Sequence, residues 1–184
     1  SLTKITIPEL VHSIGDSAFE NCTSLEQISL PSSLKYIGAL TFKGCILLNE
    51  IKIPSSVTLI GASCFAGCTS LSKMENFSKQ TIVNEKMCED CTQLKYVNIS
   101  SFVTTLNQYS FAKCSSITEI TIPSSVISIS NYAFDECSSL SHILIGSSVS
   151  SIGDFAFRKC SSLTKVTFDL NSSLTSIGKF CFIE

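Results

Sequence analysis

The sequence predicts a solenoid of stacked, similar coils, because one pattern of residue types recurs along nearly its whole length. Cysteines recur at a constant interval of about 23 residues, at Cys22, Cys45, Cys68, Cys91, Cys114, Cys137 and Cys160. A phenylalanine stands three residues before most of these cysteines. A fixed period of about 20 to 50 residues is typical of stacked units that bury their apolar faces only against their neighbours. We therefore expect residues 1–184 to form a single elongated domain of about eight coils, cut from a longer array.

The composition argues against several other classes of protein. Charged residues make up 15% of the chain and its mean hydropathy is +0.34, which excludes a disordered chain. The net charge is −2 and the basic residues are scattered, so nucleic acid is not an expected partner. Polar residues interrupt every apolar run well before the roughly 20 residues that a membrane span needs. The sequence therefore predicts no membrane-spanning segment.

The first element of each coil is a short strand. Two apolar columns are spaced by two residues, as in Ile5 with Ile7 and Ile120 with Ile122, and this spacing is typical of a β-strand. Stacked in parallel, these strands would form a sheet. Proline lacks the N–H group that a ladder needs, so the strands are expected to end at the prolines that follow them. These are Pro8, Pro31, Pro54 and Pro123.

A second apolar pair follows with a spacing of three residues, as in Val11 with Ile14, and predicts a short or bent strand on another side of the coil. Glycine then recurs in one column, which predicts a backbone corner with positive φ. Asn107 and Ser130 occupy the same place in two coils. The glycines of this column are Gly15, Gly38, Gly61, Gly153 and Gly178.

The phenylalanine and cysteine columns complete the coil. Their spacing of three residues puts both side chains on one face of a helical turn, so we expect a short helical or 3₁₀ segment there. Stacked phenylalanines at this period are interpreted as core. They are Phe19, Phe42, Phe65, Phe111, Phe134, Phe157 and Phe182.

Two coils depart from the pattern. The fourth has Phe77 for the proline, Asn84 for the glycine and Cys88 for the phenylalanine. Sequence drift explains this coil, with a distorted ligand site as the alternative. The last coil gains two residues around 170–173, which we place in a turn because turns tolerate insertions.

Ten cysteines admit three interpretations. Cysteine behaves as a small buried hydrophobe, so a column of free core thiols is favoured. Neighbouring coils should lie about 4.7 to 5 Å apart, which is also within reach of disulfide bridges. Four cysteines have a spacing close to that of a four-thiolate zinc site or a redox pair, although core filling explains all four. They are Cys64, Cys68, Cys88 and Cys91.

The unit L-x-x-I-x-I-P, followed by V-x-x-I-G-x-x-A-F-x-x-C, resembles the BspA-like leucine-rich repeats, and the resemblance covers all 184 residues. It implies a right-handed leucine-rich repeat solenoid with a parallel β-sheet on its concave face. Members of this family, which is expanded in Trichomonas and Entamoeba, are regarded as surface proteins that attach to host matrix proteins such as fibronectin, to host cells or to other microbes. The resemblance thus implies a cell-surface or secreted protein, with a cytoplasmic location as the alternative.

The outward-facing strand residues are the candidate binding residues, because in this fold the concave sheet presents them to solvent. They mix both signs of charge with one aromatic ring, which favours a protein as partner over a phosphate or a metal. One column contains Lys4, Gln27, Glu50, Lys73, Tyr96, Glu119, His142 and Lys165. The column beside it includes Lys52 and Asn98, and contains Thr6, Ser29, Glu75, Thr121, Leu144 and Thr167 at the remaining positions.

Nothing in the sequence indicates catalysis or a cofactor. His12 and His142 lie about 130 residues apart in different columns, so they cannot meet across coils that are about 5 Å apart. The predicted function is a non-enzymatic protein-binding or adhesion module. The alternatives are a structural solenoid that assembles end to end and an intracellular interaction scaffold. N-glycosylation acceptors occur at Asn21, Asn76, Asn98 and Asn171, and a sugar on Asn98 would obstruct the concave face.

Overall fold

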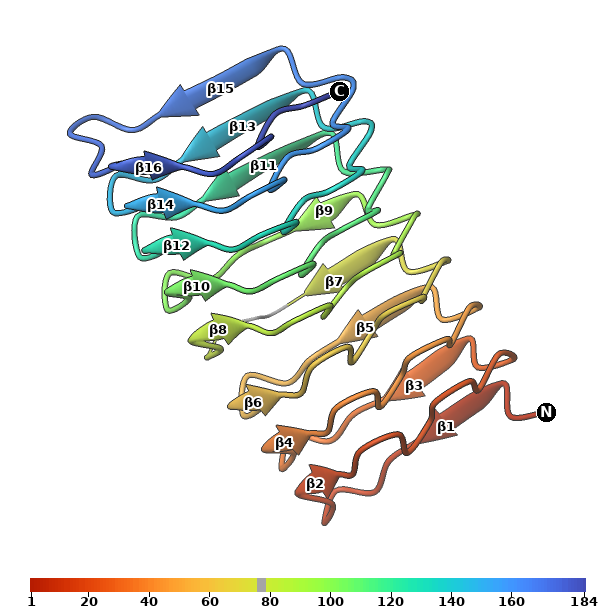
Figure 1. Ribbon diagram of the computed structural model, residues 1–184. Coiled ribbons are helices and arrows are strands. Elements are labelled where there is room, and N and C mark those ends of the chain that lie inside the picture. Colours follow the sequence, from red (N-terminus) through yellow and green to blue (C-terminus); the bar gives the residue numbers. More distant parts are fainter. Residues whose placement is uncertain (76–78) are drawn as a thin grey trace.

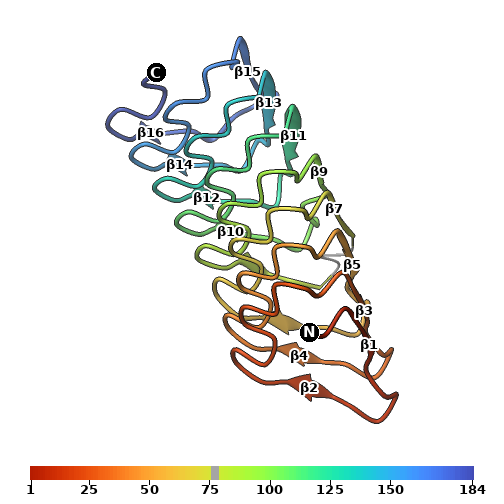
Figure 2. The ribbon, with the colours of Figure 1, turned by 90° about the vertical axis from the view of Figure 1, so that its right-hand side faces the viewer.

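The chain winds as a solenoid with its two ends at opposite ends of the molecule (Figures 1 and 2). The computed structural model describes residues 1–75 and 79–184, with the side chain of Glu75 left out. The predictions that concern Asn76, Phe77 and the Glu75 side chain lie outside the described residues. Each coil contributes two strands, and the strand pairs between neighbouring coils are parallel. We number the coils by their two strands: coil 1 carries β1 and β2, and coil 8 carries β15 and β16.

The odd-numbered strands form one side of the solenoid and the even-numbered strands another (Figure 1). The odd strands are β1 (Lys4–Thr6), β3 (Gln27–Ser29), β5 (Glu50–Lys52), β7 (Lys73–Glu75), β9 (Tyr96–Val97), β11 (Glu119–Ile122), β13 (His142–Ile145) and β15 (Lys165–Phe168). The even strands are β2 (Ser13–Ile14), β4 (Tyr36–Ile37), β6 (Leu59–Ile60), β8 (Ile82–Val83), β10 (Thr105–Leu106), β12 (Ser128–Ile129), β14 (Ser151–Ile152) and β16 (Ser176–Ile177).

The strand register confirms the predicted period. Ile5 pairs with Ile28 and Ile120 with Ile143, in each case the residue one full period further along the chain. The last coil pairs Ile152 with Ile177, and its two extra residues lie between β15 and β16, in the turn where the sequence places them. The side chains alternate as a half-buried strand requires, because in β11 the residues read exposed, buried, exposed, buried.

Both sheets are interrupted among the described residues. The ladders of the odd-strand sheet run β1-β3, β5-β7-β9 and β11-β13-β15. Those of the even-strand sheet run β2-β4-β6 and β8-β10-β12-β14-β16. Strands β3 and β5 contact each other without a ladder. Only the ladders are interrupted, because backbone hydrogen bonds in the turns still join the coils at these breaks, as from Phe42 to Cys64, Phe65 to Met87 and Phe111 to Ala133.

The predicted helical segment is wrong: the phenylalanine and cysteine columns lie in consecutive turns, and the described residues contain no helix. Two positions in this segment are left-handed, as at Ser17 (φ 55°) and Asn21 (φ 57°), and the same two positions recur in later coils. A left-handed residue ends a right-handed helix. Each turn is therefore closed separately by a hydrogen bond from a backbone N–H to the carbonyl three residues before it. The N–H of Cys22 donates to the carbonyl of Phe19 at 3.0 Å in this way.

The predicted reason for the glycine column is also wrong. The corner glycines do not have positive φ, and neither do Asn107 and Ser130; the glycines that do are Gly44 and Gly67. At Gly38, Gly61, Gly153 and Gly178 the preceding coil approaches the backbone closely, so a side chain would clash there. A Cβ atom on Gly61 would lie 2.3 Å from the backbone nitrogen of Ala39, a distance that no side chain tolerates.

The core consists of side-chain files that run along the solenoid, as predicted. Rings of the phenylalanine file stack in parallel, with centroids 5.5 Å apart for Phe19 and Phe42 and 5.3 Å apart for Phe134 and Phe157. All ten cysteines are free thiols. From Cys45 onward, each cysteine of the periodic column donates its S–H to a backbone carbonyl in the preceding coil, as Cys137 does to Phe111 at 3.1 Å. The same carbonyl oxygen also accepts a backbone N–H within its own turn. The thiol therefore supplies a donor for the second lone pair of that oxygen.

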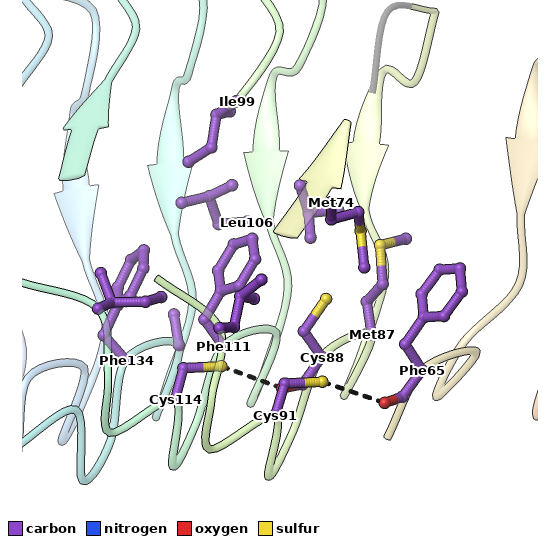
Figure 3. Packing of buried hydrophobic residues seen from close by; sticks show 14 of the residues in the cluster. Phe65, Met74, Met87, Cys88, Cys91, Ile99, Leu106, Phe111, Cys114 and Phe134 are labelled. Atoms are coloured by element: carbon purple, nitrogen blue, oxygen red, sulfur yellow. Dashed lines mark hydrogen bonds between the residues drawn. The ribbon is translucent and has the colours of Figure 1, made fainter. Parts of the chain in front are cut away.

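Coil 4 replaces a phenylalanine of the file by Cys88, and two methionines fill the space. Figure 3 shows Met74, Met87 and Cys88 between Phe65 and Phe111. They are the only methionines of the sequence and both are buried. Methionine is unbranched and fills irregular gaps. The irregularity of coil 4 is thus compensated within the core.

The break in the even-strand sheet lies between β6 and β8, and side chains of coil 4 bridge it. Gln80, 2% exposed, accepts the N–H of Ile60 at 3.2 Å and donates to the carbonyl of Val57 at 3.4 Å. The Asn84 side chain donates to the carbonyl of Ile60 at 2.6 Å. In other coils a backbone N–H makes that last bond, as Gly61 does to Ile37. Two amide side chains therefore replace the missing part of the ladder.

Candidate interaction surface

The outward face of the odd-numbered strands, which we call the odd-strand face, carries the predicted binding residues. The strand register places them side by side: Lys4 pairs with Gln27, Lys73 with Tyr96, and His142 with Lys165. Tyr96 is the most exposed aromatic ring of this face, with 69% of its surface accessible. His142 is half-buried and its Nε2 lies 3.3 Å from Oγ1 of Thr167. The predicted residues are thus brought together in one file, although they come from eight different coils.

The second predicted column lies on the same face. Lys52 and Asn98 are both exposed, and Thr121 alternates with the buried Ile120 and Ile122 in β11. Leu144 is half-buried and is the one apolar member of this column. Asn98, a potential glycosylation site, is exposed in the middle of the face.

Two hollows open on the odd-strand face, and each lies over a break in its sheet. The first, about 590 Å³, spans β3 and β5 and is lined by Lys4, Lys52 and Lys73 together with Glu50. The second, about 450 Å³, spans β9 and β11 and is the one that contains Tyr96. The other outward-facing side chains that line it are Asn98, Glu119, Thr121, His142 and Leu144. The breaks in the ladder therefore coincide with the hollowed parts of the candidate surface.

The even-strand face has features that sequence reasoning missed. Coils 3 and 4 expose apolar side chains there, with Leu59 50% and Ile82 40% accessible. From coil 5 on, the same column consists of Thr105, Ser128, Ser151 and Ser176, beside a shallow groove of about 700 Å³ that the three serines help to line. The signal was present in the sequence, because these residues precede the second apolar column by one position.

A second aromatic file was also missed. Tyr109, Tyr132, Phe155 and Phe180 stack with centroids between 4.7 and 5.4 Å apart, all in left-handed positions. Arg158 lies over Tyr132 at 5.4 Å and donates two 2.7 Å bonds to the carboxylate of Asp135. These hydrogen bonds raise the pKa of the Arg158 guanidinium further above its ordinary value. The arginine is thereby held between a ring and a carboxylate.

The cysteines considered for zinc are all buried, and Cys68 and Cys91 donate their S–H groups to backbone carbonyls. Burial raises the pKa of the Cys64 and Cys68 thiols well above the ordinary value, which disfavours the thiolate that a metal needs. Within residues 1–75 and 79–184, no group of three or more histidine, cysteine or acidic side chains is placed to hold a metal ion.

Comparison with protein families decides what kind of solenoid this is. The profile of the BspA type Leucine rich repeat region, in six copies, matches residues 1–118 and 104–184. The chain belongs to the BspA-type leucine-rich repeat family. The resemblance read from the repeat motif is therefore confirmed, and so is the leucine-rich repeat fold. None of the curated proteins matches the sequence.

Solved structures of bacterial leucine-rich repeat proteins are similar to this chain. One from Eubacterium ventriosum has 27% identity and a TM-score of 0.74 over 95% of this chain and 44% of its own. One from Bacteroides ovatus has 26% identity and a TM-score of 0.55, over 97% and 64%. A leucine rich cell surface protein from Faecalibacterium prausnitzii has 25% identity and a TM-score of 0.50, over 91% and 60%. This BspA-type chain spans less than two thirds of the length of each.

The family suggests a protein-interaction or adhesion-type module. In the part of the chain that the structure describes, no helix has the length and apolar character to cross a bilayer.

Proposed function

We propose that this BspA-type chain is a non-enzymatic adhesion module that binds a protein through its odd-strand face. The observation that carries the proposal is the contrast between the two sides of the odd strands. The buried columns repeat the same residue type from coil to coil, as in Ile120 and Ile143, whereas the outward column changes at every coil. The repeated apolar residues are explained by packing of each coil against the next. Side chains that differ from coil to coil give a surface the information needed to recognise one partner.

The chemistry of the face favours a protein as that partner. Its outward residues combine acidic, basic and amide groups with an exposed tyrosine, and tyrosine is enriched among residues that dominate protein interfaces. Two hollows of about 590 and 450 Å³ offer places for partner side chains. We propose a partner in an extracellular matrix or on another cell, and a location at the cell surface or outside the cell. A cell-surface relative from Faecalibacterium prausnitzii supports this location.

The test uses binding to immobilised matrix proteins, with fibronectin as the first probe, measured by biolayer interferometry. A triple variant, Tyr96→Ala, Glu119→Ala and His142→Ala, removes the centre of the odd-strand face. Its matched control, Tyr36→Ala, Glu85→Ala and His12→Ala, removes the same residue types elsewhere on the molecule. We expect the first variant to lose at least about tenfold in affinity, as loss of hot-spot residues does, and the control to bind like the parent.

Equal binding by the parent and the face variant would place the binding site elsewhere. Failure of every matrix and cell-surface protein to bind the parent would contradict the adhesive role.

A further inference from the structure

We propose that the second hollow of the odd-strand face, between Tyr96 and Glu119, takes an arginine side chain of the protein partner. This inference rests on the proposed function, because it names the chemistry of one contact on the same face. The two residues belong to adjacent coils, β9 and β11, and both line the hollow of about 450 Å³. A ring and a carboxylate thus face one space, and all the described residues that line it come from the odd strands and their ends.

The ring and the carboxylate suit a cation. The face of an aromatic ring attracts a cation through its quadrupole, and a carboxylate adds a charge-assisted hydrogen bond. Tyr96 is 69% exposed and Glu119 is exposed, so both are accessible to a partner. An acidic ligand side chain would be repelled by Glu119.

The molecule already contains a guanidinium held by a ring and a carboxylate, although with a different division of the groups between coils. Arg158, the sole arginine of the sequence, lies 5.4 Å from the Tyr132 ring centroid and bonds both carboxylate oxygens of Asp135 at 2.7 Å. The ring and carboxylate belong to one coil and the arginine to the next, so neighbouring coils bring these three groups together. This internal example shows that a ring and a carboxylate of this chain hold a guanidinium together when all three come within reach across neighbouring coils.

Other features of the hollow favour arginine over lysine. A guanidinium is planar, so it stacks on a ring while two of its N–H groups reach a carboxylate, whereas an ammonium is a compact point charge. Leu144, half-buried in the same hollow, offers an apolar contact to the methylene groups of the side chain. Lys73 flanks Tyr96 on the side of coil 4, in register with it, so the cation is expected to enter from the side of Glu119.

The experiment titrates the full chain, labelled with ¹⁵N, with N-acetyl-arginine amide and follows backbone amide shifts. N-acetyl-citrulline amide, which has the same shape without the charge, serves as the comparison ligand. We expect shifts to concentrate at residues 96–98 and 119–121 with arginine and to be absent with citrulline. Glu119→Gln and Tyr96→Ala should each weaken binding by roughly two- to fivefold, and Tyr96→Phe should retain it. Glu85→Gln, an equal change of charge at an exposed site elsewhere, should leave the affinity unchanged.

Shifts spread evenly over the exposed acidic residues, equal weakening by Glu85→Gln and Glu119→Gln, or equal binding of citrulline would each overturn the proposal. Tighter binding of N-acetyl-lysine amide would overturn the choice of arginine. The proposed function fails separately, when the triple variant of the odd-strand face keeps its affinity for a partner that the parent binds.

Discussion

At the scale of single residues, the cysteine column does more than fill space. Each thiol of the periodic column from Cys45 to Cys160 donates a hydrogen bond to the coil before it, so the column adds a link between coils. Alanine would fill less volume and would leave the carbonyl with one bond fewer. Cysteine therefore combines apolar packing with a weak donor at one position.

The buried thiols predict a loss of stability at alkaline pH. Burial raises the pKa of Cys45 and Cys181 to about 11, whereas an unfolded thiol titrates near about 8.5. The folded chain keeps protons that the unfolded chain releases in this interval. The contribution of these two protonated thiols to the free energy of unfolding is thus fully present below about pH 8.5 and is lost as the pH rises toward 11.

Urea unfolding followed by circular dichroism should therefore show a lower midpoint at about pH 10 than at about pH 8. A variant with Cys45→Ala and Cys181→Ala should show a smaller difference between the two midpoints. Identical pH dependence in the variant and the parent would contradict the role given to these thiols.

The packing of coil 4 predicts that Met87 and Cys88 are energetically coupled. Cys88→Phe alone should cost about 1 to 3 kcal/mol, because the ring would enter space that methionine fills. Met87→Ala alone should cost about 2 to 4 kcal/mol by leaving a cavity. The double variant restores the alanine and phenylalanine of coil 6, at Ala133 and Phe134, so its cost should fall below the sum by at least about 1 kcal/mol. Additive costs in urea unfolding of the four proteins would contradict this account.

At the scale of the element, several corner glycines, Gly61 among them, lie against the backbone of the coil before them. Gly61→Ala should lower the free energy of unfolding by about 2 kcal/mol or more, because its Cβ would lie 2.3 Å from the nitrogen of Ala39. Gly15→Ala is the matched control, because nothing in the structure lies within 4 Å of the added atom. We expect it to change stability by less than about 0.5 kcal/mol. Chemical denaturation of both variants checks the difference, and equal effects would refute the steric explanation.

The break between β6 and β8 makes its own prediction. Gln80→Ala should cost about 1 to 3 kcal/mol, since it leaves the N–H of Ile60 and the carbonyl of Val57 without the partners that the amide supplies. Gln27→Ala, on the exposed odd-strand face, should cost less than about 0.5 kcal/mol. Hydrogen exchange of the Ile60 amide should accelerate in the first variant only. Unchanged exchange there would show that Gln80 does not bridge the sheet.

The elements also show where sequence reasoning reaches its limit. The constant period predicts which side chains stack, so the strands, the files of Phe19 and Phe42 and the outward file of Tyr96 were all predictable. The period does not determine the backbone between the columns. Left-handed residues such as Ser17 replace the expected helix, and close approach rather than positive φ explains Gly61. The hollows depend on breaks in the ladders, which arise from interactions between coils and leave no mark in the repeat pattern.

At the scale of the whole molecule, regular stacking turns a linear sequence into a surface. Every full period moves the chain one strand spacing along the solenoid, so residues far apart in sequence become neighbours on the odd-strand face. The candidate interaction surface exists only because this step is constant. The proposal for protein binding depends on the same regularity.

The most direct test measures how the distance along the odd-strand face grows with the number of coils. Spin labels on Gln27→Cys combined with Glu119→Cys or Lys165→Cys span four and six coils, and the native thiols are buried apart from the half-buried Cys22, which Cys22→Ser removes. Pulsed electron resonance should give distances near about 19 and 29 Å, a constant step of about 4.8 Å per coil. Distances that do not grow in proportion to the coil number would contradict the stacked file on which the odd-strand face depends.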